Sequence, residues 1–265
     1  ERSFFRPGPL SPGERLRRQP HRLATHVTTN AHHTRERMLT EFPWIRGRIS
    51  TIWNGIDTRL YRPRADDLRP EEEHTLRLLG VGTVVPDKEI ERLSEALAVL
   101  RRRGGPAVEV DWAGRILDDP VSRGIAERVD ALLERHGLAE RWRWVGLRRD
   151  VAMLHGRCDA VVHPSYLEGL PNAVCEALAS GRPVLASRAA DHPRLLGEAG
   201  ERGLLFEPAD AASLADAIER LARLGPGTRA AISERARSFA ERHLSIAAYI
   251  DGYEELIDRI VAHRS

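Results

Sequence analysis

Two glutamates, Glu168 and Glu176, bracket a short segment that combines three features of a binding site. One carboxylate lies on a loop, a Gly-Leu-Pro-Asn turn opens a helix, and the second carboxylate lies one turn inside that helix. Pro171 suits a first helical turn, where its missing N–H is not needed, and Gly181 suits the helix end. Unpaired amides at a helix start attract phosphate, and carboxylates accept hydrogen bonds from sugar hydroxyls. The segment therefore predicts a site for a phosphorylated sugar.

The sequence around this segment supports the prediction of a site more strongly than the spacing does, because two glutamates eight positions apart also arise by chance. An apolar run over residues 158–165 precedes it and ends in Pro-Ser, and a second apolar run covers residues 182–187. The order of strand, loop carboxylate, helix, carboxylate and strand is typical of a βαβ unit. In open α/β sheets, ligands bind at the carboxyl end of the strands. A solvated pair of glutamates without function is the remaining alternative.

The same segment resembles the donor-site signature of the retaining GT-B glycosyltransferases, the "glycosyl transferases group 1" class (family 4-like) that uses nucleotide-activated sugars. The resemblance extends over about residues 20–262 and is specific to the superfamily, not to a substrate. The other matching motifs are Ile52-Trp53-Asn54-Gly55-Ile56-Asp57 with Tyr61 and Pro63 (the crossover between domains), Leu79-Gly80-Val81-Gly82 with Pro86-Asp87-Lys88 (the glycine-rich loop and its lysine), Trp144-Val145-Gly146 (a strand end) and Gly203-Leu204-Leu205-Phe206.

The resemblance implies a role for each matching residue. Glu176 would bind the ribose hydroxyls and Glu168 the donor sugar, and the turn at Val145-Gly146 would face the base. Lys88, the only lysine of the chain, would bind the diphosphate and act with Glu168 as a catalytic residue. The donor-binding residues implied in this way are Gly82, Thr83, Arg115, Val145, Gly146, Ser165, Gly169, Leu170, Pro171, Asn172, Ala173 and Glu176. We expect no cofactor and no metal, because cationic side chains and a helix start handle the phosphate charge.

The chain departs from the family pattern at several of these positions. Thr83 replaces the arginine partner of the lysine loop, and Glu89 replaces the glycine after the lysine. Both changes weaken diphosphate binding unless another arginine compensates, and Arg115 and Arg188 are the candidates. The loop at residues 189–191 lacks the glycines common in the family, and Arg194 follows where a glutamate is common. His163 lies in an apolar run, which favours a hydrogen-bonded core histidine over a general base.

Composition is that of an ordinary globular protein of 265 residues. Cys158 and Cys175 lie in apolar segments and are predicted to be buried in a reducing compartment. We therefore expect a cytoplasmic protein. Residues 1–64 carry 13 arginines against five acidic residues. Such a basic part is typical of contact with anionic lipid at the inner membrane face or with phosphorylated substrates, but also of a solvated face. Nucleic-acid binding is not indicated, because aromatic interleaving and recognition motifs are missing.

Strand and helix patterns alternate from about residue 75, which predicts an α/β fold of GT-B type: a Rossmann-like parallel sheet with helices on both faces. The expected site residues fall at the strand carboxyl ends, on one rim. The expected strands are 75–82, 108–114, 142–146, 159–164, 183–187 and 204–207, preceded by shorter ones at 26–30 and 49–53. The expected helices are 34–41, 90–103, 122–136, 149–156, 171–180, 191–197, 211–224, 229–242 and 245–262.

Three domains follow from the resemblance. Residues 1–55 would be a remnant of the amino-terminal, acceptor-side Rossmann domain, beginning with an irregular lead-in at 2–18, and residues 56–244 the nucleotide-sugar-binding domain. Residues 245–265 would form a helix that crosses back. Because the chain begins with Glu1 and lacks the earlier part of the first domain, we expect a fragment that binds donor without transferring it, and an apolar face over residues 26–53. An upstream segment or a separate chain would restore transfer.

The function implied is transfer of a sugar, with retention, from a nucleotide-sugar to a glycan, lipid or small-molecule acceptor. A non-catalytic donor-binding or regulatory fragment is the alternative, because Thr83 and Glu89 depart from the pattern. Another GT-B enzyme, such as a nucleotide-sugar epimerase or a phosphorylase, is a weaker one.

Overall fold

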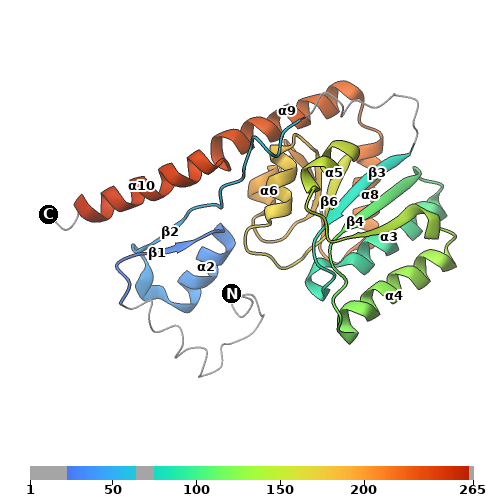
Figure 1. The fold of residues 1–265 in the computed structure, drawn as a ribbon, viewed down its shortest axis with the longest axis horizontal. Helices are drawn as coiled ribbons and strands as arrows, with labels where there is room; N and C mark the ends of the chain where they lie inside the picture. Colours follow the sequence, from blue (N-terminus) through green and yellow to red (C-terminus); the bar gives the residue numbers. More distant parts are fainter. Residues whose placement is uncertain (1–22, 64–74, 263–265) are drawn as a thin grey trace.

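The computed structural model describes residues 23–63 and 75–262 (Figure 1). The arginine-rich residues 1–22, which include the expected irregular lead-in, lie outside the described residues, so the basic amino-terminal part is described only from residue 23 onward. Within the described ranges, no helix combines the length and the apolar character that a membrane span requires.

A six-stranded parallel sheet forms the centre of the larger part of the molecule, as the sequence predicts. Its strand order is β5-β4-β3-β6-β7-β8. The order reverses at the junction of β3 and β6, which are neighbours in space although three α-helices, two 3-10 helices and two strands separate them in the chain. A crevice at the strand carboxyl ends forms at such a reversal. The strands are β3 (Leu76–Val81), β4 (Val108–Ala113), β5 (Trp142–Gly146), β6 (Ala160–His163), β7 (Val184–Ser187) and β8 (Gly203–Phe206).

Helices cover both faces of this sheet (Figure 1), which confirms the second part of the fold prediction. On one face, α3, α4 and α8 bury their apolar stripes, and on the other face α5, α6, α7 and α9 do so. The helices are η5 (Pro86–Lys88), α3 (Ile90–Arg103), α4 (Pro120–Arg135), η6 (Ala139–Arg141), α5 (Val151–Arg157), α6 (Asn172–Ala179), α7 (His192–Leu196), α8 (Ala211–Ala222), α9 (Pro226–His243) and α10 (Ile246–Ala262).

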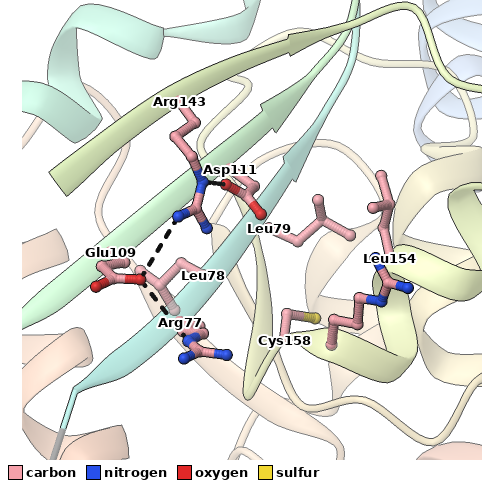
Figure 2. Close-up of a pocket in the computed structure, with 9 residues that line it drawn as sticks. Arg77, Leu78, Leu79, Glu109, Asp111, Arg143, Leu154 and Cys158 are labelled. Carbon is pink, nitrogen blue, oxygen red and sulfur yellow. Dashed lines mark hydrogen bonds and ion pairs between the residues drawn. The ribbon is translucent and has the colours of Figure 1, made fainter. Parts of the chain in front are cut away.

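The apolar content of each strand matches its place in the sheet. Every residue of the inner strands β6 and β7 is buried, because both of their faces carry helices. On β3, β4 and β5, by contrast, positions that are not buried carry a ladder of charges, Arg77, Glu109, Asp111 and Arg143 (Figure 2). The cavity that these residues line has a volume of about 10 Å³, which is space for about one water molecule. The ion pairs of this ladder join three neighbouring strands, and the cavity beside them leaves no room for an organic ligand.

The amino-terminal part is a separate small unit with its own core. Its elements are β1 (Val27–Thr29), α2 (His32–Glu41), η3 (Pro43–Ile45) and β2 (Ile49–Thr51), and β1 pairs with β2 in parallel. Val27, Met38, Phe42, Ile45 and Ile49 bury one another in this unit.

The prediction of an apolar face over residues 26–53 is therefore largely wrong, because a helix packed on two strands buries most of its own apolar side chains. Among the described residues, a row of exposed apolar side chains lies on α10 instead, made of Ile246, Ile250, Ile257 and Val261. Helix α10 extends from α9 toward the small unit (Figure 1), where Tyr253 contacts Thr28.

Asp191 joins the small unit to the larger one. Its fully buried carboxylate accepts hydrogen bonds from the backbone N–H groups of His32 and His33, at 2.7 and 2.8 Å, and from Trp53 Nε1 at 3.1 Å. The N-cap residue of α2, Ala31, supplies no side-chain cap of its own. Asp191 therefore caps a helix far away in the sequence, with negative charge at the positive end of the helix dipole.

Replacing Asp191 by alanine should detach this cap and loosen the small unit. We expect a loss of about 3 kcal/mol in the free energy of unfolding, because two backbone donors and one indole donor lose a charged acceptor in a buried site. Urea denaturation measures the loss, and hydrogen exchange should be fastest in α2. Unchanged exchange in α2 would contradict the capping role.

Candidate functional site

Lys88 and Glu168 meet at the carboxyl ends of β3 and β6, where the reversal of strand order predicts a crevice. Lys88 ends η5 in the loop after β3, and Glu168 lies in the loop after β6. The ammonium Nζ donates a hydrogen bond to Glu168 Oε1, and the two side chains are 20% and 15% exposed. The two residues expected to be catalytic are thus brought together at a rim that ligand can reach. Their catalytic role stays a prediction.

Glycines make room for this lysine. A Cβ atom on Gly82 would lie 3.1 Å from Lys88 Cε, so the lysine stem passes over bare backbone. A Cβ on Gly114 would lie 1.8 Å from the carbonyl oxygen of Gly82, which itself accepts a hydrogen bond from Trp112 Nε1 at 2.8 Å. The loop after β4 therefore fixes the loop that carries Thr83 and Lys88.

The departures from the family pattern are accommodated in the backbone. Glu89 and Ala190 both adopt left-handed backbone conformations, with φ of 49° and 48°. Glycine adopts this conformation readily, and the family pattern has glycine at the position of Glu89 and often has glycines in the loop of Ala190. Because Arg92 Nε lies 3.3 Å from Glu89 Oε2, the extra carboxylate has its own cationic partner in the first turn of α3. Glu89 therefore does not compete for Lys88 in this structure.

The two arginines considered as replacements for the missing cation differ in their surroundings. Arg188 forms ion pairs with Glu198 and with Glu207. Arg115 is exposed, and no acidic side chain of residues 23–63 and 75–262 lies within 4.0 Å of it. The backbone oxygen of Arg115 accepts from Val84 N at 2.9 Å, which places its loop beside the lysine loop. Arg115 is the better candidate of the two.

The helix start predicted at Pro171 lies one residue later. Pro171 is the N-cap, and its carbonyl accepts from Val174 N at 2.9 Å and Cys175 N at 3.1 Å. No side chain caps α6, so the predicted phosphate contacts of the stretch Leu170–Ala173 would be made by the N–H groups of Leu170, Asn172 and Ala173. Leu170 is buried beneath the turn and anchors it, while Asn172 is exposed and accepts at Oδ1 from Asn54 Nδ2 at 3.0 Å. The crossover segment therefore touches the expected phosphate site.

The two carboxylates of the motif have opposite electrostatic environments. Burial by itself would raise the pKa of Glu168, but the hydrogen bond from His163 and the charge of Lys88 hold it well below the usual range. Burial raises the pKa of Glu176 to about 7, although the hydroxyl of Tyr61 donates a hydrogen bond to it. Glu168 is thus ionised at neutral pH, whereas Glu176 is poised between its two forms.

Tyr61 is a contact of Glu176 that the sequence did not indicate. The guanidinium of Arg237 fixes this part of the crossover segment, because Nη1 donates to the carbonyl oxygens of Thr58, Tyr61 and Ala179. The Tyr61 ring also packs against His155 on α5, with 5.7 Å between the ring centroids. The motif predicted a crossover here, but not that its aromatic residue reaches the second carboxylate.

The pKa of Glu176 predicts pH-dependent binding of a nucleotide-sugar. Ribose hydroxyls bind best to a carboxylate, so affinity should rise roughly tenfold from pH 6 to pH 8 as Glu176 ionises. Folding stability should change in the opposite sense, because a raised carboxyl pKa stabilises the folded chain at low pH and that stability is lost as the pH rises through about 7. Calorimetric titration across this range measures the affinity. A Glu176→Gln variant with the same pH profile as the unchanged chain would contradict the assignment.

The remaining expected site residues divide into two groups. Ser165 is fully buried, and its hydroxyl donates to the Asp87 carbonyl at 2.8 Å, so it ties the two loops together instead of facing the crevice. Its contact with the donor stays a prediction. Val145 and Gly146 end β5, where Gly146 has φ of 68° and the chain turns outward. Beside them the apolar side chain of Leu147 is 64% exposed, which the sequence pattern does not predict.

Comparison with known proteins gives this geometry a family. The family model of "Glycosyl transferases group 1" matches residues 75–223. The MMP alpha-(1->4)-mannosyltransferase of Mycolicibacterium hassiacum is 28% identical over 236 residues, which cover 85% of this chain and 53% of that protein. The D-inositol 3-phosphate glycosyltransferase of Mycobacterium marinum is 30% identical over 200 residues, which cover 71% of this chain and 40% of that protein. The chain thus spans about half the length of these relatives.

Solved structures show the same fold. Anabaena Alr3699/HepE, in complex with UDP and glucose, superposes with a TM-score of 0.79 at 22% identity, covering 90% of this chain and 64% of that one. Sucrose-phosphate synthase from Thermosynechococcus elongatus superposes with a TM-score of 0.77 at 25% identity, covering 91% and 59%. The expected GT-B type of fold is confirmed, and the chain belongs to the Glycosyl transferases group 1 family.

Proposed function

We propose that the chain is the nucleotide-sugar-binding part of a glycosyltransferase that transfers the sugar with retention to a glycan, lipid or small-molecule acceptor. The observation that supports this most strongly is the meeting of Lys88 and Glu168 beside the uncapped start of α6, at the point where the strand order reverses. Ligands of open α/β folds bind at this point. The complexes of Anabaena Alr3699/HepE with UDP and glucose and with UDP-glucose agree with a nucleotide-sugar as the ligand.

The chemistry follows from where charge develops. In the transfer, the bond between the anomeric carbon and a diphosphate oxygen breaks, a bond to the acceptor oxygen forms, and the proton of the acceptor hydroxyl passes to the departing diphosphate. Negative charge grows on the departing diphosphate, where Lys88 and the amides at the start of α6 stabilise it. These groups supply cationic and dipolar stabilisation without a metal, so we expect transfer to need none.

The two carboxylates have separate tasks in this proposal. Glu168, ionised and facing the crevice, binds a hydroxyl of the donor sugar. Glu176, one turn into α6, binds the ribose, and the turn at Val145-Gly146 with Leu147 contacts the base. The acceptor side is proposed to come from residues beyond those described. We propose further that a separate chain can supply this acceptor side. We also propose that the arginine-rich amino-terminal part contacts anionic lipid.

A second candidate function is donor binding without catalysis. The replacement of a cationic side chain by Thr83 favours it, because one fewer charge then stabilises the leaving diphosphate. Transfer measured with a full set of acceptors separates the two candidates.

Alanine variants of the two carboxylates test the proposal. Glu176→Ala should weaken the binding of nucleoside diphosphate and nucleotide-sugar alike, whereas Glu168→Ala should mainly reduce the preference for the nucleotide-sugar. Each loss should be about 1.5–3 kcal/mol, the value of a charge-assisted hydrogen bond. Calorimetric titration with both ligands measures it, and Glu127→Ala on the exposed face of α4 is the control. Equal and negligible losses in both site variants would contradict the proposal.

A further inference from the structure

We propose that His163 is a positioning residue for the donor sugar: it holds Glu168 so that one carboxylate oxygen stays directed at the crevice whether or not Lys88 is engaged by diphosphate. This inference rests on the proposed function and deepens it. His163 is the last residue of β6 and is only 2% exposed, so it acts on a ligand through Glu168 and not by direct contact.

Two contacts hold the ring of His163, one with Glu168 and one with His192. Nε2 lies 3.0 Å from Glu168 Oε1. The ring meets His192 edge-on, with centroids 5.2 Å apart and planes at 87°. His192 is itself fixed, because its Nδ1 lies 2.8 Å from the carbonyl oxygen of Ser187 at the end of β7 and donates to it. The imidazole therefore has a rigid support in the next strand and in α7.

The protonation state of His163 gives the bond its direction. Burial lowers the pKa of His163, the hydrogen bond with Glu168 opposes this, and the charge of Lys88 adds to the lowering. The ring is consequently neutral at neutral pH and carries one N–H group. Because the carboxylate of Glu168 is ionised, that proton lies on Nε2 and is donated to Glu168.

Both donors of Glu168 use the same oxygen. Lys88 Nζ and His163 Nε2 both contact Oε1, which leaves Oε2 as the acceptor for a sugar hydroxyl. Lys88 is also the cation expected to turn to the diphosphate. His163 has no such second task, so it keeps Glu168 ionised and oriented when the lysine is drawn away. The titratable groups that face Glu168 are Lys88 from η5, His163 from β6 and His192 from α7.

The test compares two variants of the 265-residue chain by titration with a nucleoside diphosphate and with the corresponding nucleotide-sugar. His163→Leu removes the donor at similar volume, and His163→Gln retains an N–H group of similar reach. We expect His163→Leu to bind nucleoside diphosphate within twofold of the unchanged chain, but to lose about tenfold of its preference for the nucleotide-sugar. His163→Gln should recover most of the preference.

The pH profile gives a readout that a merely structural role would not move. In His163→Leu, burial of Glu168 is less opposed and its pKa rises, so the preference should fall further between pH 7 and pH 5, while the unchanged chain stays constant. Thermal unfolding checks that both variants fold. If His163→Leu does not fold, His163→Gln is compared with His163→Asn instead. The shorter side chain of His163→Asn should lose the preference for nucleotide-sugar. The inference would be overturned if His163→Leu, or His163→Asn where it takes the place of His163→Leu, kept the full preference for nucleotide-sugar with a flat pH profile. An unchanged chain that shows no preference for nucleotide-sugar would instead overturn the proposed function.

Discussion

The 265-residue chain alone is expected to bind a nucleotide-sugar and to release no nucleoside diphosphate from it when a mixed pool of acceptors is supplied. Transfer needs an acceptor hydroxyl held against the anomeric carbon, and such positioning supplies roughly 7–11 kcal/mol of barrier lowering. In the described residues, only β1, α2, η3 and β2 stand on the amino-terminal side of the crossover, and the relatives are about twice as long. Release of nucleoside diphosphate is the measurement.

A full-length member of the family, assayed with the same pool of donors and acceptors, is the control for this experiment. It should turn over under conditions in which the 265-residue chain does not. Robust turnover by the 265-residue chain alone would contradict the expectation and would mean that its own residues form an acceptor site.

Lys88→Ala should weaken the binding of nucleoside diphosphate roughly 100-fold. The variant loses a charge-assisted contact to the phosphates, and it also leaves Glu168 without its cation at the same rim, where a carboxylate repels the ligand. Calorimetric titration at constant ionic strength measures the loss, because exposed charge interactions are screened by salt.

Two further variants sharpen this result. Lys88→Arg retains the charge and should recover part of the affinity for nucleoside diphosphate. The recovery should be partial, because the side chain at position 88 passes close to the backbone of Gly82 and the guanidinium is larger than the ammonium. Arg115→Ala, in the neighbouring loop, should cost only about threefold, since an exposed guanidinium contributes little. Equal affinities for Lys88→Ala and the unchanged chain would place the diphosphate elsewhere.

The parts of the fold that the sequence predicts well are those whose signals are local. The helix expected at 90–103 and the strand expected at 142–146 have these bounds in the structure, since apolar periodicity and flanking glycines mark them. The start of α2 was expected at Thr34 but lies at His32, because its cap is Asp191 from the far side of the chain. No local pattern could reveal that cap.

The candidate site shows the same division. The motif predicts that Lys88 and Glu168 share one rim, and the parallel sheet brings them into contact. The apolar run predicts that His163 is a buried, hydrogen-bonded histidine, which is confirmed, but its partner Glu168 follows only from the fold. The same holds for the hydrogen bond from Tyr61 to Glu176, because this contact depends on how separate segments meet.

A crystal structure of the chain with a bound nucleoside diphosphate tests the proposed donor site most directly. We predict that the diphosphate lies at the start of α6, within hydrogen-bond distance of Lys88 Nζ and of the N–H groups of Leu170, Asn172 and Ala173. The ribose hydroxyls should lie on Glu176 and the base beside Val145-Gly146. Lys88 should then have left Glu168, while the hydrogen bond from His163 to Glu168 persists. A nucleotide bound away from the crevice between β3 and β6, or none at millimolar concentration, would contradict the proposal.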